Sequence, residues 1–160
     1  MVVRSLVPVS VRAKGDHSLN NQVSAIIADG QMHAAEHAML TRIARALRSR
    51  ETCVLVAETE GRFAGFAITE FGDTRAHLSL FAVQPAHQRR GIGLAMIEWI
   101  MESVLTAGIT QIDVEMRSNN FAARSFYETL GFVPTGQITG YYQNIETAVR
   151  MQRRLGSMAA

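Results

Sequence analysis

This sequence holds little that a disulfide framework or a membrane span would require. Its 160 residues include a single cysteine, Cys53, which excludes an internal disulfide and is typical of a reducing compartment. No apolar run approaches the ~18 residues of a membrane helix, and the first residues lack the basic and long apolar segments of a signal peptide. We therefore expect a cytoplasmic protein without membrane contact.

Lysine is also scarce, because Lys14 is the only one among sixteen basic residues. The arginines are scattered, and fourteen acidic residues leave a net charge of only +2, which excludes a nucleic-acid surface. Arginine does suit recognition of a phosphorylated small molecule. A composition with 48% hydrophobic and 19% charged residues is typical of a folded protein, and we expect residues 1–160 to form a single domain.

Apolar runs and helical spacing predict a mixed α/β architecture. The expected strands are 2–11, 52–58, 63–71, 77–83, 111–116, 132–143 and 145–154. The expected helices are 16–28, 31–49, 91–107 and 121–130, with Gly108 as the C-terminal cap of the third and Asn119 or Asn120 as the N-cap of the fourth. This order, βααβββαβαββ, predicts a mixed and mostly antiparallel central sheet of about 6–7 strands flanked by about four helices. A doubly wound fold is excluded, because no Gly-x-Gly-x-x-Gly follows the first strand.

The most informative stretch joins the expected strand at 77–83 to the expected helix at 91–107. Pro85 has no N–H group to donate to a neighbouring strand, so the strand should end there. Two arginines and two glycines follow within Gln88, Arg89, Arg90, Gly91, Ile92 and Gly93. Glycine allows close approach of the main chain to a phosphate, and a helix N-terminus supplies N–H donors. Two interpretations remain open: an anion-binding loop, or a plain strand–turn–helix corner with solvated arginines.

A carboxylate and a phenol follow this loop. Glu115 ends the expected strand at 111–116, where ligands usually gather in α/β sheets, and Tyr127 lies within the next helix. A base, a weak acid and an anion-binding loop form a coherent set for group transfer. The alternatives also stay open, because a strand glutamate is usually solvated and a helical tyrosine beside Phe126 usually belongs to the core.

Two motifs in this order resemble the GNAT N-acetyltransferases. Val83-x-Pro85-x-x-Gln88-x-x-Gly91-x-Gly93 before a long helix resembles the acetyl-CoA pyrophosphate loop of that family. The segment 115–132 is similar to the Glu-Val-Arg-x-x-Asn-x-x-Ala-x-x-x-Tyr-x-x-x-Gly-Phe run of the ribosomal-protein alanine acetyltransferases, which modify protein N-termini. Tyr141-Tyr142 and residues 146–151 are similar to their C-terminal hairpin. The resemblance covers residues 52–155 and implies a GNAT-like fold.

The resemblance implies acetyl-CoA as cosubstrate, without a metal, and a role for each matching residue. Main-chain groups of residues 81–83 would pair with the pantetheine arm, and N–H groups of residues 88–93 would cradle the pyrophosphate. Asn120 would reach the pantetheine, Tyr127 the thioester sulfur and Glu115 the incoming amine. The implied catalytic residues are Glu115 and Tyr127. The implied cofactor-binding residues are Phe81, Ala82, Val83, Gln88, Arg89, Arg90, Gly91, Ile92, Gly93, Asn120 and Tyr127.

The expected chemistry is direct transfer in a ternary complex. Glu115 or a water removes the proton of the amine, the amine attacks the thioester, and Tyr127 protonates the leaving thiolate. Three functions remain open: acetylation of a protein or peptide N-terminus, acetylation of a small amine (amino acid, polyamine or antibiotic), or non-catalytic binding of acyl-CoA. The presence of both Glu115 and Tyr127 argues against the third. A monomer or a homodimer is expected.

Two further features are predicted to be structural. His33-Ala34-Ala35-Glu36-His37 matches the His-x-x-Glu-His pattern of one class of zinc peptidases. No third ligand is identifiable, so we expect a helix surface with two solvated histidines. Cys53 lies in the middle of an expected strand, away from any positive helix end, and is predicted to be a small buried apolar residue.

Overall fold

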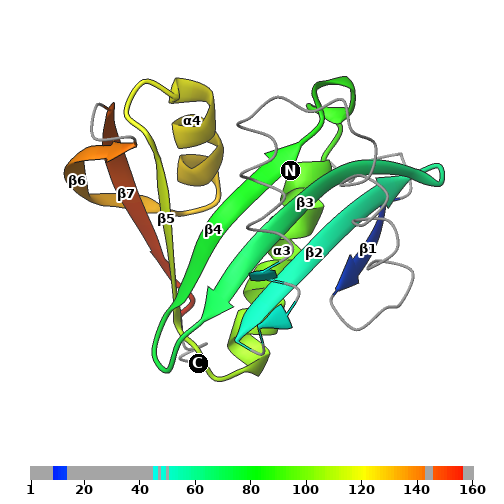
Figure 1. Ribbon diagram of the computed structural model, residues 1–160, viewed down its shortest axis with the longest axis horizontal. Coiled ribbons are helices and arrows are strands. Elements are labelled where there is room, and N and C mark those ends of the chain that lie inside the picture. Colours follow the sequence, from blue (N-terminus) through cyan, green and yellow to red (C-terminus); the bar gives the residue numbers. More distant parts are fainter. Residues whose placement is uncertain (1–8, 14–44, 47, 50, 143–145, 157–160) are drawn as a thin grey trace. The chain divides into compact units, whose positions relative to one another are not determined.

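The computed structural model describes residues 9–13, 45–46, 48–49, 51–142 and 146–156. The strands of this part of the chain are β1 (Val9–Ala13), β2 (Thr52–Thr59), β3 (Arg62–Phe71), β4 (Ala76–Val83), β5 (Gln111–Arg117), β6 (Val133–Tyr142) and β7 (Glu146–Arg154) (Figure 1). Its helices are η1 (Pro85–His87), α3 (Ile92–Thr106) and α4 (Phe121–Thr129). The helices expected at 16–28 and 31–49, apart from residues 45–46 and 48–49, lie outside the described residues, as does the His33–His37 pattern.

The seven strands follow the order β1-β2-β3-β4-β5-β7-β6 in one sheet. Antiparallel pairing joins β1 to β2, β2 to β3, β5 to β7 and β6 to β7. By contrast, β4 and β5 pair in parallel, with His77 opposite Asp113. The predicted mixed and mostly antiparallel sheet is therefore confirmed.

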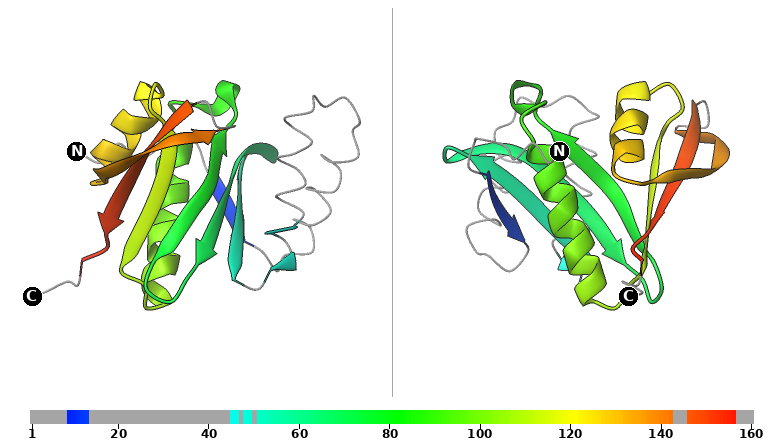
Figure 2. Two further views of the ribbon diagram at one scale, coloured as in Figure 1. Left: turned by 60° about the vertical axis from the view of Figure 1, so that its left-hand side comes forward. Right: turned by 180° about the vertical axis from the view of Figure 1, so that it is seen from behind.

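The chain divides into two compact units. Unit 1 comprises residues 1–70 and 80–100, and unit 2 comprises residues 71–79 and 101–160. In unit 1, β2 is buried without interruption from Val54 to Ala57, as is typical of a strand covered on both faces. The unit 1 part of α3 runs along one face of β2 and β3 (Figures 1 and 2). Its buried residues recur at helical spacing and are Ile92, Met96, Ile97 and Ile100.

In unit 2, α4 lies beside β5 (Figures 1 and 2). The apolar side chains of β5 alternate with polar ones, so that Ile112, Val114 and Met116 are buried on one face of the strand. The opposite face carries the polar residues of β5, including Asp113 and Glu115. Both carboxylates therefore lie on the same face of the sheet in this unit.

The turns explain where the elements begin and end. Glu60 and Gly61 both have positive φ, 53° and 72°, as a two-residue hairpin turn requires. Gly108, with φ of 81°, follows the end of α3, which confirms the predicted C-terminal cap. The first strand extends beyond the predicted end at residue 11, because Ala13 still pairs with Leu55.

Two smaller predictions have clear outcomes. Cys53 lies within β2 as predicted, but it is half-buried because it stands near the start of that strand, before the fully buried run from Val54 to Ala57. Within the described residues, no helix has the length and apolarity that a bilayer crossing needs.

Candidate functional site

The turn between β4 and α3 is joined by one hydrogen bond to β3 and by another to the end of β4. The N–H of Gln84 donates to the carbonyl of Ala64 at 2.8 Å, which continues the contact between β3 and β4 by one residue. The turn then passes through η1, and the Gln88 side chain reaches back, donating from Nε2 to the carbonyl of Val83 at 3.0 Å. The glutamine of the predicted loop thus braces the strand from which the loop departs.

Two residues of this turn have left-handed backbone. Arg89 has φ of 62° and Gly91 has φ of 81°. Such a value is strained for a side chain with a Cβ, and strain of this kind is often found at ligand-binding turns. Gly91 also begins the hydrogen-bond ladder of α3, because its carbonyl accepts from the N–H of Ala95 at 3.1 Å.

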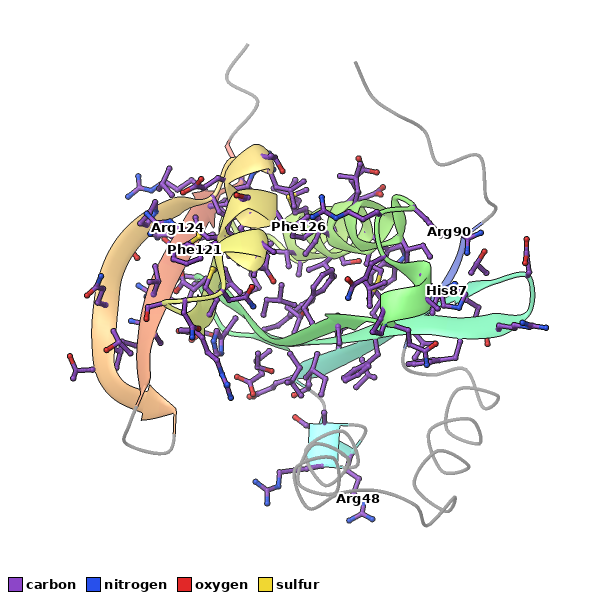
Figure 3. The ribbon with its side chains drawn as sticks, turned by 90° about the horizontal axis from the view of Figure 1, so that it is seen from above. Arg48, His87, Arg90, Phe121, Arg124 and Phe126 are labelled. Carbon is purple, nitrogen blue, oxygen red and sulfur yellow. The ribbon has the colours of Figure 1, made fainter. Side chains whose placement is uncertain are left out.

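The beginning of α3 presents N–H groups without a compensating carboxylate. The first N–H groups of a helix have no partner within the helix, and the positive end of the helix dipole lies there. The first turn of α3 contains no acidic residue. Arg89 and Arg90 are both exposed, and Nη1 of Arg90 lies 3.4 Å from Nδ1 of His87 (Figure 3). This turn can therefore hold an anion with main-chain donors and two guanidinium groups.

Gly65, which our sequence reasoning missed, allows β3 to approach the end of β4. A Cβ at this position would lie 2.5 Å from the carbonyl oxygen of Ala82 and 3.2 Å from Cα of Val83. An isolated glycine inside a strand pattern is the available signal for such a close approach. The main chain of residues 81–83 is thus positioned by a glycine on the neighbouring strand.

Glu115 is clamped between two other strands of unit 2. Its side chain is only 7% exposed, so the interpretation as a solvated strand glutamate is wrong. Oε1 accepts from Nε of Arg150, the residue directly opposite on β7, at 3.0 Å. Oε2 forms a hydrogen bond with Nε2 of His77 on β4. We call these three residues the Glu115 clamp.

The clamp determines the charge of the carboxylate. Burial alone raises the pKa of Glu115, because a low-dielectric environment disfavours the charged form. Hydrogen bonds and positive charge from His77, and then from Arg150, act in the opposite direction and prevail. The pKa of Glu115 is therefore lowered from its ordinary value of 4.5, and the side chain is a carboxylate at neutral pH.

Asn120 and Tyr127 lie on α4. Oδ1 of Asn120 accepts from the N–H of Ala123 at 3.1 Å, so of the two predicted N-cap candidates, Asn119 and Asn120, the second is the cap. Tyr127 is 4% exposed. Its ring meets Phe126 and Phe132 edge-on, with centroids 5.4 Å and 5.3 Å away. The interpretation of Tyr127 as a core residue is thus confirmed, and its role in chemistry stays a prediction.

The predicted residues divide between the two units. The residues 81–83 and 88–93 belong to unit 1, whereas Glu115, Asn120 and Tyr127 belong to unit 2. Our sequence reasoning missed His77 and Arg150, since their contact with Glu115 depends on the strand register. Among the described residues, no group of three or more His, Cys, Asp or Glu side chains could hold a metal ion.

Comparison with known proteins identifies the same family that the two sequence motifs resemble. The sequence model of the acetyltransferase (GNAT) family matches residues 21–132. The ribosomal protein bS18-alanine N-acetyltransferase of Salmonella typhimurium is 37% identical to this chain over 95 residues. That alignment covers 58% of this chain and 64% of the Salmonella protein. The chain thus spans somewhat less than two thirds of this relative.

Solved structures match nearly the whole chain. The ribosomal-protein-S18-alanine N-acetyltransferase from Escherichia coli superimposes with a TM-score of 0.74 at 25% identity, covering 96% of this chain and 97% of that one. Ard1 from Thermoplasma volcanium gives a TM-score of 0.78 at 23% identity, covering 94% and 100% respectively. The predicted fold class is confirmed by these likenesses.

Proposed function

Because the chain belongs to the acetyltransferase (GNAT) family, we propose that it is an acetyl-CoA-dependent N-acetyltransferase acting as one domain over residues 1–160. The main support for this proposal is the turn between β4 and α3. Its backbone is left-handed at Arg89 and Gly91, and it opens a helix whose first turn has no acidic residue. These features suit a pyrophosphate bound by main-chain N–H groups.

In this proposal unit 1 binds acetyl-CoA. Main-chain groups of Phe81, Ala82 and Val83 pair with the pantetheine arm in the manner of a neighbouring strand. N–H groups from Gln88 to Gly93, including those of Gly91 and Ile92, bind the pyrophosphate, and Arg89 and Arg90 add positive charge. The brace from Gln88 to Val83 supports this assignment, because it joins the two segments that would bind one cofactor.

Unit 2 supplies the groups that move protons. Glu115, directly or through a water, accepts the proton that the acceptor amine loses as its nitrogen attacks the thioester carbonyl. The C–N bond forms, the C–S bond breaks, and Tyr127 gives its proton to the departing thiolate. Asn120 contacts the pantetheine with its side-chain amide. The lowered pKa of Glu115 keeps the group ionised at neutral pH, and the ionised form is the one that the first step requires.

The acceptor that we propose is the N-terminal amine of a protein or peptide. The support is the 37% identity to an enzyme named for the alanine of ribosomal protein bS18. An α-amine has a pKa of about 8, so a substantial fraction loses its proton near neutral pH with modest help from a base. A small amine such as a polyamine is the competing acceptor.

A panel of acceptors tests this proposal. Purified protein and acetyl-CoA are incubated with N-terminal peptides, with the same peptides blocked at the α-amine, and with free amino acids and polyamines. Release of CoA thiol and the mass of each product are measured. We expect acetylation of free N-termini and none of blocked ones. Preferred acetylation of the polyamines would replace the proposed acceptor, and no CoA release with any amine would refute the proposed function.

A further inference from the structure

Within the part of the chain that the structure describes, each oxygen of the Glu115 carboxylate has one side-chain donor. Nε of Arg150 reaches Oε1 from β7 at 3.0 Å, and Nε2 of His77 reaches Oε2 from β4. A carboxylate has about four lone-pair sites, so the two contacts leave one site on each oxygen for an amine or a water. The clamp fixes the rotation of the carboxylate without using up its capacity to accept a proton.

The two donors differ in chemistry. An arginine stays charged at every relevant pH, so Arg150 contributes a constant attraction. An imidazole can gain or lose a proton, so His77 contributes a hydrogen bond and a positive charge that depends on its protonation. The His77 side chain is also more exposed than that of Glu115, at 32% against 7%. Of the two groups of the clamp that can change protonation, His77 is therefore the more accessible to solvent.

We propose that His77 is a positioning residue for the acetyl transfer, holding the Glu115 carboxylate in the orientation from which it accepts the proton of the amine. The inference rests on the proposed function, because it assumes that Glu115 is the proton acceptor. Arg150 provides the second fixed point, so that the carboxylate is held from β4 and from β7.

The clamp also makes the strength of the base depend on pH. His77 lowers the pKa of Glu115 by its hydrogen bond and by its charge. When His77 loses its proton, the charge disappears while an N–H donor is retained in one tautomer, and Glu115 becomes a better proton acceptor. We therefore expect part of the rise of kcat/KM with pH to require His77.

Other charged residues lie near the pair. Asp113 stands opposite His77 in the register of β4 and β5, and its carboxylate binds Nη1 of Arg75 at 3.4 Å and Nε2 of Gln111 at 3.0 Å. Glu70 lies near the end of β3, the other neighbour of β4 in the sheet. The pair Arg75–Asp113 involves β5 but no atom of the clamp, and it therefore provides a matched control.

Titration of the Glu115 carboxyl tests the clamp directly. The ¹³C resonance of this group is followed by NMR in protein labelled at glutamate, with Glu115→Gln to assign the signal. We expect His77→Leu to raise the pH at which Glu115 titrates, and His77→Gln to raise it less, because glutamine keeps an N–H donor. Arg75→Gln should leave the titration unchanged. Identical titrations in wild type, His77→Leu and His77→Gln would overturn the proposal.

Kinetics then test whether the clamp serves the reaction. We expect His77→Leu to lower kcat by roughly 10-fold to 100-fold, since a misplaced base is costly, with the KM for acetyl-CoA unchanged. Its kcat/KM profile should lose the part of the rise with pH that requires His77, and His77→Gln should recover most of kcat. Unchanged kcat and pH profile in both variants would contradict the role of His77. Absence of turnover in the wild type would refute the proposed function instead, while the NMR titration would still test the clamp.

If His77→Leu does not fold, as judged by thermal unfolding, the NMR titration and the kinetics are both measured on the conservative variant His77→Gln. It must then show a higher titration pH for Glu115 together with an altered kcat/KM profile. A folded His77→Gln that matches the wild type in both measurements would overturn the proposal.

Discussion

The turn of unit 1 and the clamp of unit 2 are built from different parts of the chain. The turn between β4 and α3 is continuous in sequence, and its features are main-chain ones: left-handed backbone at Arg89 and Gly91 and the open end of a helix. The Glu115 clamp is assembled from side chains of β4, β5 and β7, which lie far apart in sequence. We infer that the turn is sensitive to changes of backbone, whereas the clamp is sensitive to changes of charge.

The largest effect is expected from the phenol of unit 2. Tyr127→Phe keeps the ring and its edge-on contacts with Phe126 and Phe132 but removes the proton donor. General acid catalysis contributes about 10²-fold or more, so kcat should fall by roughly that factor with acetyl-CoA affinity unchanged. Steady-state kinetics and calorimetric titration of the same preparation measure the two properties. A kcat equal to that of the wild type would remove Tyr127 from the proposed mechanism.

A large effect on stability is expected in unit 1, where the backbone of β4 leaves no space beside Gly65. Gly65→Ala would place a Cβ 2.5 Å from the carbonyl oxygen of Ala82, and overpacking of this kind costs about 1–3 kcal/mol. The free energy of unfolding in urea should decrease by that amount. Gly136→Ala in β6 is the control, because a Cβ there would meet nothing within 4 Å. Equal stabilities of the two variants would contradict the close approach.

Two glycines that flank α3 allow the effect of backbone strain to be distinguished from the effect of lost anion binding. Gly91 and Gly108 flank the two ends of this helix with the same φ of 81°, so an alanine at either position imposes similar strain, about 1 kcal/mol. Gly91→Ala should weaken acetyl-CoA binding by roughly 10-fold or more, because it displaces main-chain donors that bind the pyrophosphate. Gly108→Ala should bind acetyl-CoA as the wild type does. Calorimetry measures both, and equal loss of affinity would show that strain alone is responsible.

The smallest effect concerns the stability of the clamp in acid. The pKa of Glu115 in the folded protein is below its ordinary value of 4.5, so the folded state binds its proton less readily than the unfolded state. The resulting stabilisation is fully present above about pH 4.5 and is lost as the pH falls through the lower folded value. The difference in unfolding free energy between wild type and Glu115→Gln should therefore shrink below this pH. A difference that stays constant down to pH 3 would contradict the lowered pKa.

The sequence was most informative where structure is local. Pro85, the two glycines of the loop and Asn120 predicted the end of β4, the start of α3 and the cap of α4, because each acts through its own backbone or within one helical turn. The hairpin at Glu60-Gly61 was predictable for the same reason. The position of Glu115 at the end of a strand was also readable, since apolar alternation marks β5.

The clamp was not predictable from the sequence, because it depends on the register of strands. His77 and Arg150 are 38 and 35 residues from Glu115, and nothing in the local pattern selects them over other basic residues. A register shift by one residue would turn each of them to the opposite face of the sheet. Tyr127 posed a different problem, because a phenol packed between two phenylalanines has the same sequence pattern whether or not it takes part in chemistry.

One measurement tests most directly whether cofactor binding belongs to the turn and proton transfer to the clamp. Glu115→Gln removes the proposed proton acceptor without touching the turn, and its acetyl-CoA affinity and its turnover are measured on the same sample. We predict wild-type affinity together with a loss of kcat of about 10²-fold or more. Wild-type turnover in this variant, or a turnover lost only through weaker acetyl-CoA binding, would contradict the account.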